Sequence, residues 1–337
     1  MLAACGGDDA APTTTRPAST TAATAPPQPA NVAPLTGLPA DAAALARPLL
    51  IVKIDNAPKA RPQAGLNQAD VVFEEAVEGG VTRFAVLFHS QDADPVGPVR
   101  SARSTDILIA TPLNRPLFAY SGTNATFQQQ VATAPLVDLG PDKRPGAYRR
   151  QPGRPAPYNL FSGAGALRAG NAGTAPPPLF AYRTAGAPAA DGTPAAGVVV
   201  EFPGIVVTSA EWRWDAGANA WTRSEVTYKP GTRESTTRTP HVDAAGQLVT
   251  AHNVVVQFAT YHDTGQIDQS GEPVPEADLI GEGEAWVLTD GKVIKGRWRR
   301  TSPDAVTEYL DGSGQPIRLT PGRTWVELPK PGMGQLS

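Results

Sequence analysis

The chain has 337 residues, 41% of them hydrophobic, a formal net charge of −3 and a single cysteine. The near-neutral charge argues against a nucleic-acid-binding surface, and one cysteine excludes a framework of intrachain disulfides. No segment approaches the roughly 18 consecutive apolar residues of a membrane-spanning helix. With about 34 N-terminal residues set aside, roughly 300 remain, which is enough for two domains.

The N-terminus carries the pattern of a lipidation site. Leu2-Ala3-Ala4-Cys5 matches a bacterial lipobox, in which a signal peptidase cuts before the cysteine and the thiol is joined to diacylglycerol. Only Met1 precedes this motif, so we expect the true start, with the charged and apolar regions of a signal peptide, to lie upstream. The alternative is a chance match in an alanine-rich chain. The Thr/Pro/Ala-rich stretch that follows, to residue 34, is too poor in apolar groups to fold and is typical of a disordered tether.

Residues 35–180 are predicted to form a mixed α/β domain. Short apolar runs predict strands at 49–54, 70–75 and 82–89, with a tight connection at Gly79-Gly80. Ser101 or Ser104 can cap a helix that continues to about residue 110. Farther along, a strand is expected over 116–120, followed by Ser121-Gly122-Thr123-Asn124 and a second capped helix, and residues 134–160 are irregular and basic.

Residues 197–330 are predicted to form a mostly antiparallel β domain, after a Pro/Ala-rich boundary at 171–196. Strands are expected at 198–202, 211–214, 219–223, 253–261, 284–289, 292–299 and 324–328. Asp290-Gly291, between two alternating runs, is a strong hairpin signal. The predicted fold class is α+β, with a mixed α/β N-terminal domain and a β-rich C-terminal domain.

A cluster of charged side chains between residues 53 and 103 is the candidate site. Arg83 alternates with Phe84, so it shares a strand face with apolar residues and needs a partner, which Glu74 or Glu78 could provide. Arg100 and Arg103 are expected at a helix start, where the macrodipole disfavours cations unless they hold an anion. The predicted ligand contacts are Arg61, Arg83, Arg100 and Arg103, with Asn56 and Gln63 orienting the ligand and Asp55, Glu74 and Glu78 supporting the arginines.

Two other interpretations of this cluster are open. In the first, the charges form an internal ion-pair network that fixes the hairpin against the helix. In the second, the protein is an envelope hydrolase or transferase acting on a glycan or phosphoester, with Glu74 or Glu78 as general acid/base. The four histidines are scattered without the short spacing of a zinc site, so no metal is predicted. No cofactor is predicted either.

The same stretches resemble the YerB-type lipoprotein family. The resemblance is carried by KIDN (53–56), ARPQAGL (60–66), ADVVFE (69–74), EGGVTRF (78–84), GPVRSAR (97–103) and GRTW (322–325). It extends over about residues 34–330 and implies a lipid-anchored protein with an α/β N-terminal part and a β-rich C-terminal part, but no reaction. One departure is Tyr158 in Pro157-Tyr158-Asn159-Leu160, where the family pattern leads us to expect histidine.

We therefore expect a lipid-anchored protein on the extracytoplasmic face of the cell membrane. Its predicted role is non-catalytic: binding or scaffolding of an anionic cell-envelope component or of another envelope protein. The membrane contact is expected to run through Cys5, and no nucleic-acid partner is predicted.

Overall fold

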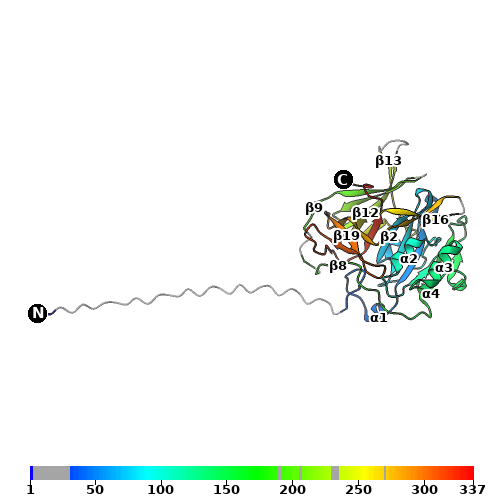
Figure 1. Cartoon of the computed structure of the whole chain (residues 1–337), viewed down its shortest axis with the longest axis horizontal. Helices are drawn as coiled ribbons and strands as arrows, with labels where there is room; N and C mark the ends of the chain where they lie inside the picture. Colours follow the sequence, from blue (N-terminus) through cyan, green and yellow to red (C-terminus); the bar gives the residue numbers. More distant parts are fainter. Residues whose placement is uncertain (3–30, 185, 188–190, 205–206, 229–234, 269–270) are drawn as a thin grey trace.

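The computed structural model describes residues 1–2, 31–184, 186–187, 191–204, 207–228, 235–268 and 271–337. The predicted lipidation site, Cys5, and the predicted tether up to residue 30 lie outside the described residues. None of the described helices is long and apolar enough to cross a membrane. Helices α2, α3 and α4 gather at one side of the molecule, and strands β8, β9 and β19 lie at the other (Figure 1).

The larger sheet has 11 strands and is built from both halves of the chain, in the order β20-β19-β18-β15-β22-β2-β3-β1-β4-β5, with β9 beside β19. The N-terminal half contributes β1 (Leu50–Asp55), β2 (Val71–Ala76), β3 (Thr82–Phe88), β4 (Leu117–Ala119) and β5 (Val137–Asp138). The C-terminal half contributes β9 (Thr193–Pro194), β15 (Asn253–Gln257), β18 (Gly281–Thr289), β19 (Lys292–Arg300), β20 (Glu308–Leu310) and β22 (Thr324–Leu328).

A second, 6-stranded sheet packs on one face of the first, in the order β13-β12-β11-β10-β23 with β14 beside β12. Its strands are β10 (Gly197–Phe202), β11 (Thr208–Asp215), β12 (Ala220–Tyr228), β13 (Ser235–Pro240), β14 (Thr250–Ala251) and β23 (Gly334–Leu336). Smaller pairs are β6 (Tyr148–Arg150) with β7 (Leu160–Ser162), β8 (Ala181–Tyr182) with β21 (Arg318–Leu319), and β16 (Tyr261–Ile267) with β17 (Pro273–Ala277). The helices are α1 (Ala42–Leu45), α2 (Ser104–Ala110), α3 (Ala125–Thr133) and α4 (Ala164–Arg168), and four short 3-10 segments lie at 58–60, 66–68, 78–80 and 145–147.

Strand β22 joins the two halves of the chain. It runs parallel to β2 and to β15, with Trp325 opposite Val72 on one side and opposite Val254 on the other. A strand from near the C-terminus therefore lies in the middle of the large sheet, and this sheet continues without a break from one predicted domain into the other. Whether 35–180 and 197–330 fold separately stays a prediction.

The α+β class is confirmed, and the C-terminal half is β-rich and largely antiparallel as expected. Asp290-Gly291 connects β18 to β19, and both residues have positive φ (50° and 70°) as a two-residue hairpin turn requires. The parallel pairs of β22 were not expected from the sequence, because alternation along a strand indicates which residues are buried but not which strand lies alongside.

Side-chain alternation along the central strands gives the large sheet two different cores. Val52 and Ile54 belong to the core shared with the second sheet, whereas Ile51 belongs to the core beneath α2 and α3. Successive side chains of a strand point to opposite faces. Neighbouring charges such as Glu74 and Glu75 on β2 therefore have different partners.

Helix α2 begins at Ser104 with Arg103 as its N-cap residue, so the expectation that Ser101 or Ser104 caps it is wrong. The carboxylate of Asp106 accepts the main-chain N–H of Arg103 at 2.7 Å. It also accepts the Nζ group of the fully buried Lys53 at 2.7 Å. A carboxylate does here what a serine hydroxyl cannot, because it both closes the helix start and balances a buried positive charge.

Candidate functional site

The predicted site residues separate into two groups on opposite faces of the large sheet. Arg83, Arg100 and Arg103 lie on the α2 side together with Asp55 and Glu78. The other predicted residues, Asn56, Arg61, Gln63 and Glu74, lie in a polar cluster against the second sheet. The cause is the register of β2 and β3, in which Glu75 lies opposite Arg83 and Glu74 lies opposite Phe84.

Glu74 is the centre of the polar cluster between the sheets and is fully buried. One carboxylate oxygen accepts Asn56 Nδ2 at 3.0 Å and Thr82 Oγ1 at 2.6 Å. The other accepts Arg223 Nη2, from β12, at 2.7 Å. Both oxygens of Glu74 are thus occupied by internal partners.

Gln63 and Arg61 complete this cluster through the second sheet. Gln63 Nε2 donates to Asn56 Oδ1 at 3.0 Å, and its Oε1 lies 2.8 Å from His241 Nε2. Arg61 lies 3.0 Å from Glu225, which also pairs with Arg223. These contacts tie the first connection of the N-terminal half to β12, and they occupy the groups that were expected to orient a ligand.

The charges of this cluster depend on one another. Burial by itself lowers the pKa of Arg223, but Glu225 and Glu74 outweigh it, so the guanidinium pKa is held above its usual value. Burial and then the neighbouring carboxylate of Glu74 raise the pKa of Glu327, which lies beside Glu74 on β22, well above its usual value. Arg223 is therefore the cation that allows Glu74 to remain in the interior.

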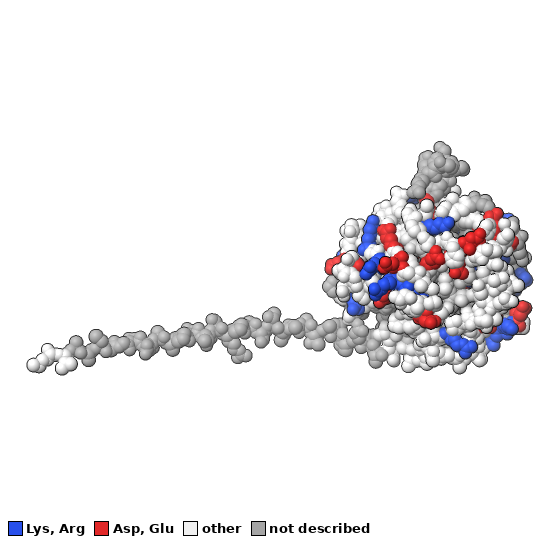
Figure 2. Space-filling model, in the orientation of Figure 1, with Lys and Arg blue, Asp and Glu red and all other residues white. Residues whose placement is uncertain are grey.

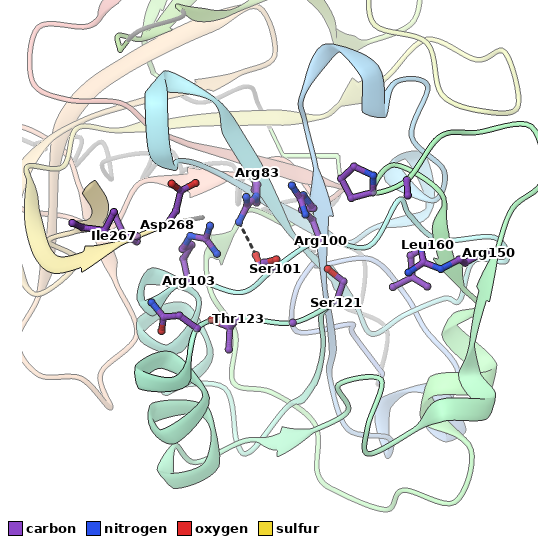
Figure 3. A pocket seen from close by; sticks show the side chains of 15 residues that line it. Arg83, Arg100, Ser101, Arg103, Ser121, Thr123, Arg150, Leu160, Ile267 and Asp268 are labelled. Atoms are coloured by element: carbon purple, nitrogen blue, oxygen red, sulfur yellow. Dashed lines mark hydrogen bonds between the residues drawn. The ribbon is translucent and has the colours of Figure 1, made fainter. Parts of the chain in front are cut away.

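A cavity of about 720 Å³ lies on the α2 side (Figure 3). Four arginines line it: Arg83, Arg100, Arg103 and Arg150. The other lining residues are Ser101, Ser121, Gly122, Thr123, Asn124, Ala156, Pro157, Leu160, Ile267, Asp268 and Val274. We call this cavity the arginine pocket.

The sheet topology explains where the arginine pocket forms. β1 and β4 are parallel neighbours, and Asp55 and Ser121 lie at or just beyond their carboxyl ends. Ligands of sheets with parallel strands commonly bind at this end, where loops leave the sheet. The loop after β4 leads directly into α3, which Asn124 caps by accepting the N–H of Phe127 at 2.8 Å. The loop, the start of α3 and the arginines therefore meet at the carboxyl ends of β1 and β4.

Arg83, Arg100 and Arg103, which we call the inner arginines, form ion pairs with two carboxylates among the described residues, Glu78 and Asp55. Arg103 makes a two-pronged pair with Glu78, with Nη2 2.8 Å from Oε2. Arg83 is only 3.8 Å from the same carboxylate, and its Nη1 donates to the main-chain oxygen of Ser101 at 3.0 Å. Arg100 Nε lies 3.0 Å from Asp55. Burial, and then repulsion by Arg103, lower the pKa of Arg83 to about 10.

Sequence reasoning missed two components of the arginine pocket. Arg150 was noted only as part of an irregular basic stretch, yet β6 brings it to the pocket, where its Nη1 donates to Asn159 at 2.7 Å. The loop 121–124 was expected only as a helix cap. A glycine between a strand and an N-cap residue was the available signal, since Gly122 has a φ of 145°.

Glu74 and Glu78, the predicted acid/base candidates, do not share a cleft. Glu74 lies between the sheets, while Glu78 lies beyond the end of β2 with both oxygens held by Arg103. The predicted catalytic role stays a prediction that this geometry does not support. Among the residues that the structure describes, no group of three His, Cys, Asp or Glu side chains is placed to hold a metal ion.

A third charged cluster, formed by Lys53, Glu75 and Asp106, contains none of the predicted site residues. It makes the stability of the protein depend on pH in a way that can be measured. Fully buried Lys53 lies between Glu75 and Asp106, and burial followed by repulsion from Asp106 raises the pKa of Glu75 to about 7. Between the unfolded value of 4.5 and about 7, the folded protein binds more protons at Glu75 than the unfolded chain does. The free energy of unfolding should therefore fall as pH rises through this range.

We expect Glu75→Gln to remove this fall. Urea denaturation at about pH 5 and about pH 7 should show a loss on the order of 1–3 kcal/mol for the unmodified protein and a smaller loss for the variant. His89, whose pKa burial lowers to about 4, acts in the opposite direction but is present in both proteins. Identical losses in the two proteins would contradict the assignment to Glu75.

Comparison with known proteins places this chain in a family. The family described as "Protein of unknown function (DUF3048) N-terminal domain" matches residues 35–176, and its C-terminal counterpart matches residues 200–326. The chain is 28% identical over 304 residues to "Putative lipoprotein YerB" of Bacillus subtilis (strain 168), covering 88% of this chain and 85% of that protein. The crystal structure of YerB from Bacillus subtilis aligns with a TM-score of 0.74 at 26% identity, over 91% of this chain and 99% of that one. The resemblance seen in the motifs is confirmed, and the chain belongs to the DUF3048 family of unknown function, whose members include YerB-like lipoproteins.

Proposed function

We propose that this protein is a lipid-anchored binding protein on the extracytoplasmic face of the cell membrane, and that its arginine pocket holds an anionic envelope component. The name of the Bacillus subtilis relative supports the lipoprotein assignment. The Leu-Ala-Ala-Cys motif ending at Cys5 supplies the attachment point for a diacylglycerol anchor. A folded part anchored in this way works close to the membrane surface.

The observation that carries the proposal is the unbalanced positive charge in the arginine pocket. Arg83 is 7% exposed, and its Nε has no hydrogen-bond partner among the residues that the structure describes. A buried cation is stable when it is paired and hydrogen-bonded. Arg83 shares Glu78 with Arg103 and lies opposite Asp55 and Glu75 in the sheet. Because the pocket brings four arginines together, an anion entering it would supply a further acceptor.

The surface outside the pocket supports a localised site. On the face shown in Figure 2, basic and acidic side chains are interspersed and form no extended field of one sign. Such a surface favours recognition of a defined anionic group in the pocket over diffuse attraction of a polyanion. The occupied oxygens of Glu74 and Glu78 likewise support binding over acid/base catalysis, which needs a carboxyl group open to the substrate.

We expect Arg100→Gln and Arg150→Gln to weaken anion binding. The exposed Arg150 can be replaced with the fold intact, whereas the partly exposed Arg100 pairs with the buried Asp55, so its replacement should also lower stability. The experiment measures thermal shifts of the full chain carrying Cys5→Ser against inorganic phosphate, muropeptides and teichoic-acid fragments. A probe at about one hundred times its Kd should raise the free energy of unfolding of the protein with the unmodified pocket by about 2.7 kcal/mol.

The matched control is Arg299→Gln, since Arg299 lies on β19 in an exposed pair with Glu308 and does not line the pocket. It should respond to the probe as the unmodified pocket does. Equal responses from all variants, or none from any protein, would overturn the proposed function.

A further inference from the structure

The loop 121–124 offers main-chain donors to the arginine pocket. Among the described residues, the N–H groups of Gly122, Thr123 and Asn124 donate to no protein acceptor, whereas that of Ser121 donates to the main-chain oxygen of Arg100 at 2.9 Å. The first N–H groups of α3 also lack intrahelical acceptors, and a helix N-terminus carries partial positive charge. A side chain at Gly122 would meet nothing within 4 Å, so the space beside this loop is open.

A second, independent observation on the facing wall points to the same space. The arginines 83, 100 and 103 converge around Ser101 from one side, while Ser121 and Thr123 lie on the other (Figure 3). Arg83 is more than nine-tenths buried, lines this space, and has the unpartnered Nε described above. Donors therefore approach one position from at least two directions.

The directions of these donors distinguish between classes of anion. A carboxylate is planar, and a single guanidinium can bind both of its oxygens in one plane. A phosphoryl group carries three acceptor oxygens arranged around a tetrahedral centre and a charge of about −1.5 to −2 near pH 7. Facing walls of guanidinium and main-chain N–H groups suit the tetrahedral group, because each wall can bind a different oxygen.

The charge of the pocket agrees with a phosphoryl ligand. Its four arginines outnumber the three carboxylates that pair with them or line the pocket, Asp55, Glu78 and Asp268. The N-terminus of α3 adds to this positive potential. Asp268, just beyond β16, lies beside Arg103 at the β16–β17 side of the pocket (Figure 3).

The remaining walls of the pocket are apolar. Leu160 lies at one end of the pocket and Ile267 at the other (Figure 3), and Pro157 and Val274 also line it. Ile267 is 65% exposed, which is unusual for a large apolar side chain at the edge of a cavity. A volume of about 720 Å³ is in the range of sites for organic ligands rather than for a bare ion.

We propose that the ligand class is an organic phosphate monoester with an apolar body. Its phosphoryl group lies between loop 121–124 and the inner arginines, and its body extends toward Ile267 and Val274 on the β16–β17 side. This inference rests on the proposed function, because it specifies the anion that the same pocket binds.

The test varies the head group on a constant body. Isothermal titration of the full chain carrying Cys5→Ser uses geranyl monophosphate, geranoate, geraniol and inorganic phosphate. We expect geranyl monophosphate to bind at least about tenfold tighter than each of the other three, since each lacks either the phosphoryl contacts or the apolar contacts.

Substitutions test which residues contact the phosphoryl group of the ligand and which contact its apolar body. Arg100→Gln should weaken geranyl monophosphate and inorganic phosphate alike, by about tenfold. Ile267→Ser should weaken geranyl monophosphate by about threefold to tenfold and leave inorganic phosphate unchanged. The control is Ile280→Ser, at an exposed isoleucine that does not line the pocket, and it should change neither.

The outcomes separate this inference from the proposed function. If geranoate binds as tightly as geranyl monophosphate, the phosphoryl assignment is wrong and the anion pocket stands. If inorganic phosphate or geraniol binds as tightly as the full ligand, the two-part assignment is overturned. If none of the anions binds, or if Arg100→Gln has no effect on binding, the proposed function fails as well.

Discussion

Replacing Arg223 with methionine is expected to lower the free energy of unfolding by about 3–5 kcal/mol. Arg223 is fully buried and pairs with Glu74 at 2.7 Å, and Glu327 lies beside Glu74 in the adjacent strand. Without the guanidinium, the carboxyl groups of Glu74 and Glu327 remain in the interior and lose their fully buried cationic neighbour. Breaking one side of a buried pair is costly because the other charge stays desolvated. Urea denaturation at neutral pH measures the loss.

Two further variants make this prediction specific. Adding Glu74→Gln to Arg223→Met should restore part of the lost stability, since the stranded charge is removed. Arg299→Met, which breaks the exposed pair with Glu308, should cost only about 0–1 kcal/mol. A similar small loss for Arg223→Met would show that the cluster between the sheets is not the buried ion pair described above.

Trp325→Ala is expected to cost about 3–5 kcal/mol and to destabilise both halves of the chain together. Trp325 is 2% exposed and lies on β22, which joins the halves. Its ring lies 5.2 Å from that of Phe84 on β3 and 5.1 Å from that of Trp212 on β11. Truncation therefore removes contacts to the N-terminal half, to the second sheet and to the middle of the large sheet at once.

Calorimetry and hydrogen exchange test this coupling. The unmodified protein should unfold in a single transition, and Trp325→Ala should accelerate exchange in both β1 and β18, which belong to different halves. Trp325→Phe keeps an aromatic ring and should lose less stability than the alanine variant. Two separate transitions, or faster exchange in β18 alone, would mean that the halves fold independently despite their shared sheet.

Local sequence patterns were sufficient to predict several strands and turns and part of the candidate site. Short apolar runs predicted the strands that became β1, β2 and β3 to within two residues at each end, and the Asp290-Gly291 turn was predicted from its residue types. Alternation along the third of these strands placed Arg83 on a face with apolar neighbours, and it is buried there. Of its two candidate partners, Glu78 is the one in contact, because Glu74 faces the second sheet.

The family, the α+β class, the central strands and three of the four pocket arginines, Arg83, Arg100 and Arg103, could be predicted from the sequence alone. Each of these depends on local periodicity, residue type or an ordered set of motifs, all of which can be observed along the chain. The three-dimensional structure was needed to show that β22 lies between β2 and β15, and that Glu74 pairs with Arg223, 149 residues away. It also brought Arg150 and Ile267 to the same cavity as Arg83. Strand order and register arise from the summed packing of two cores, and no short segment contains that information.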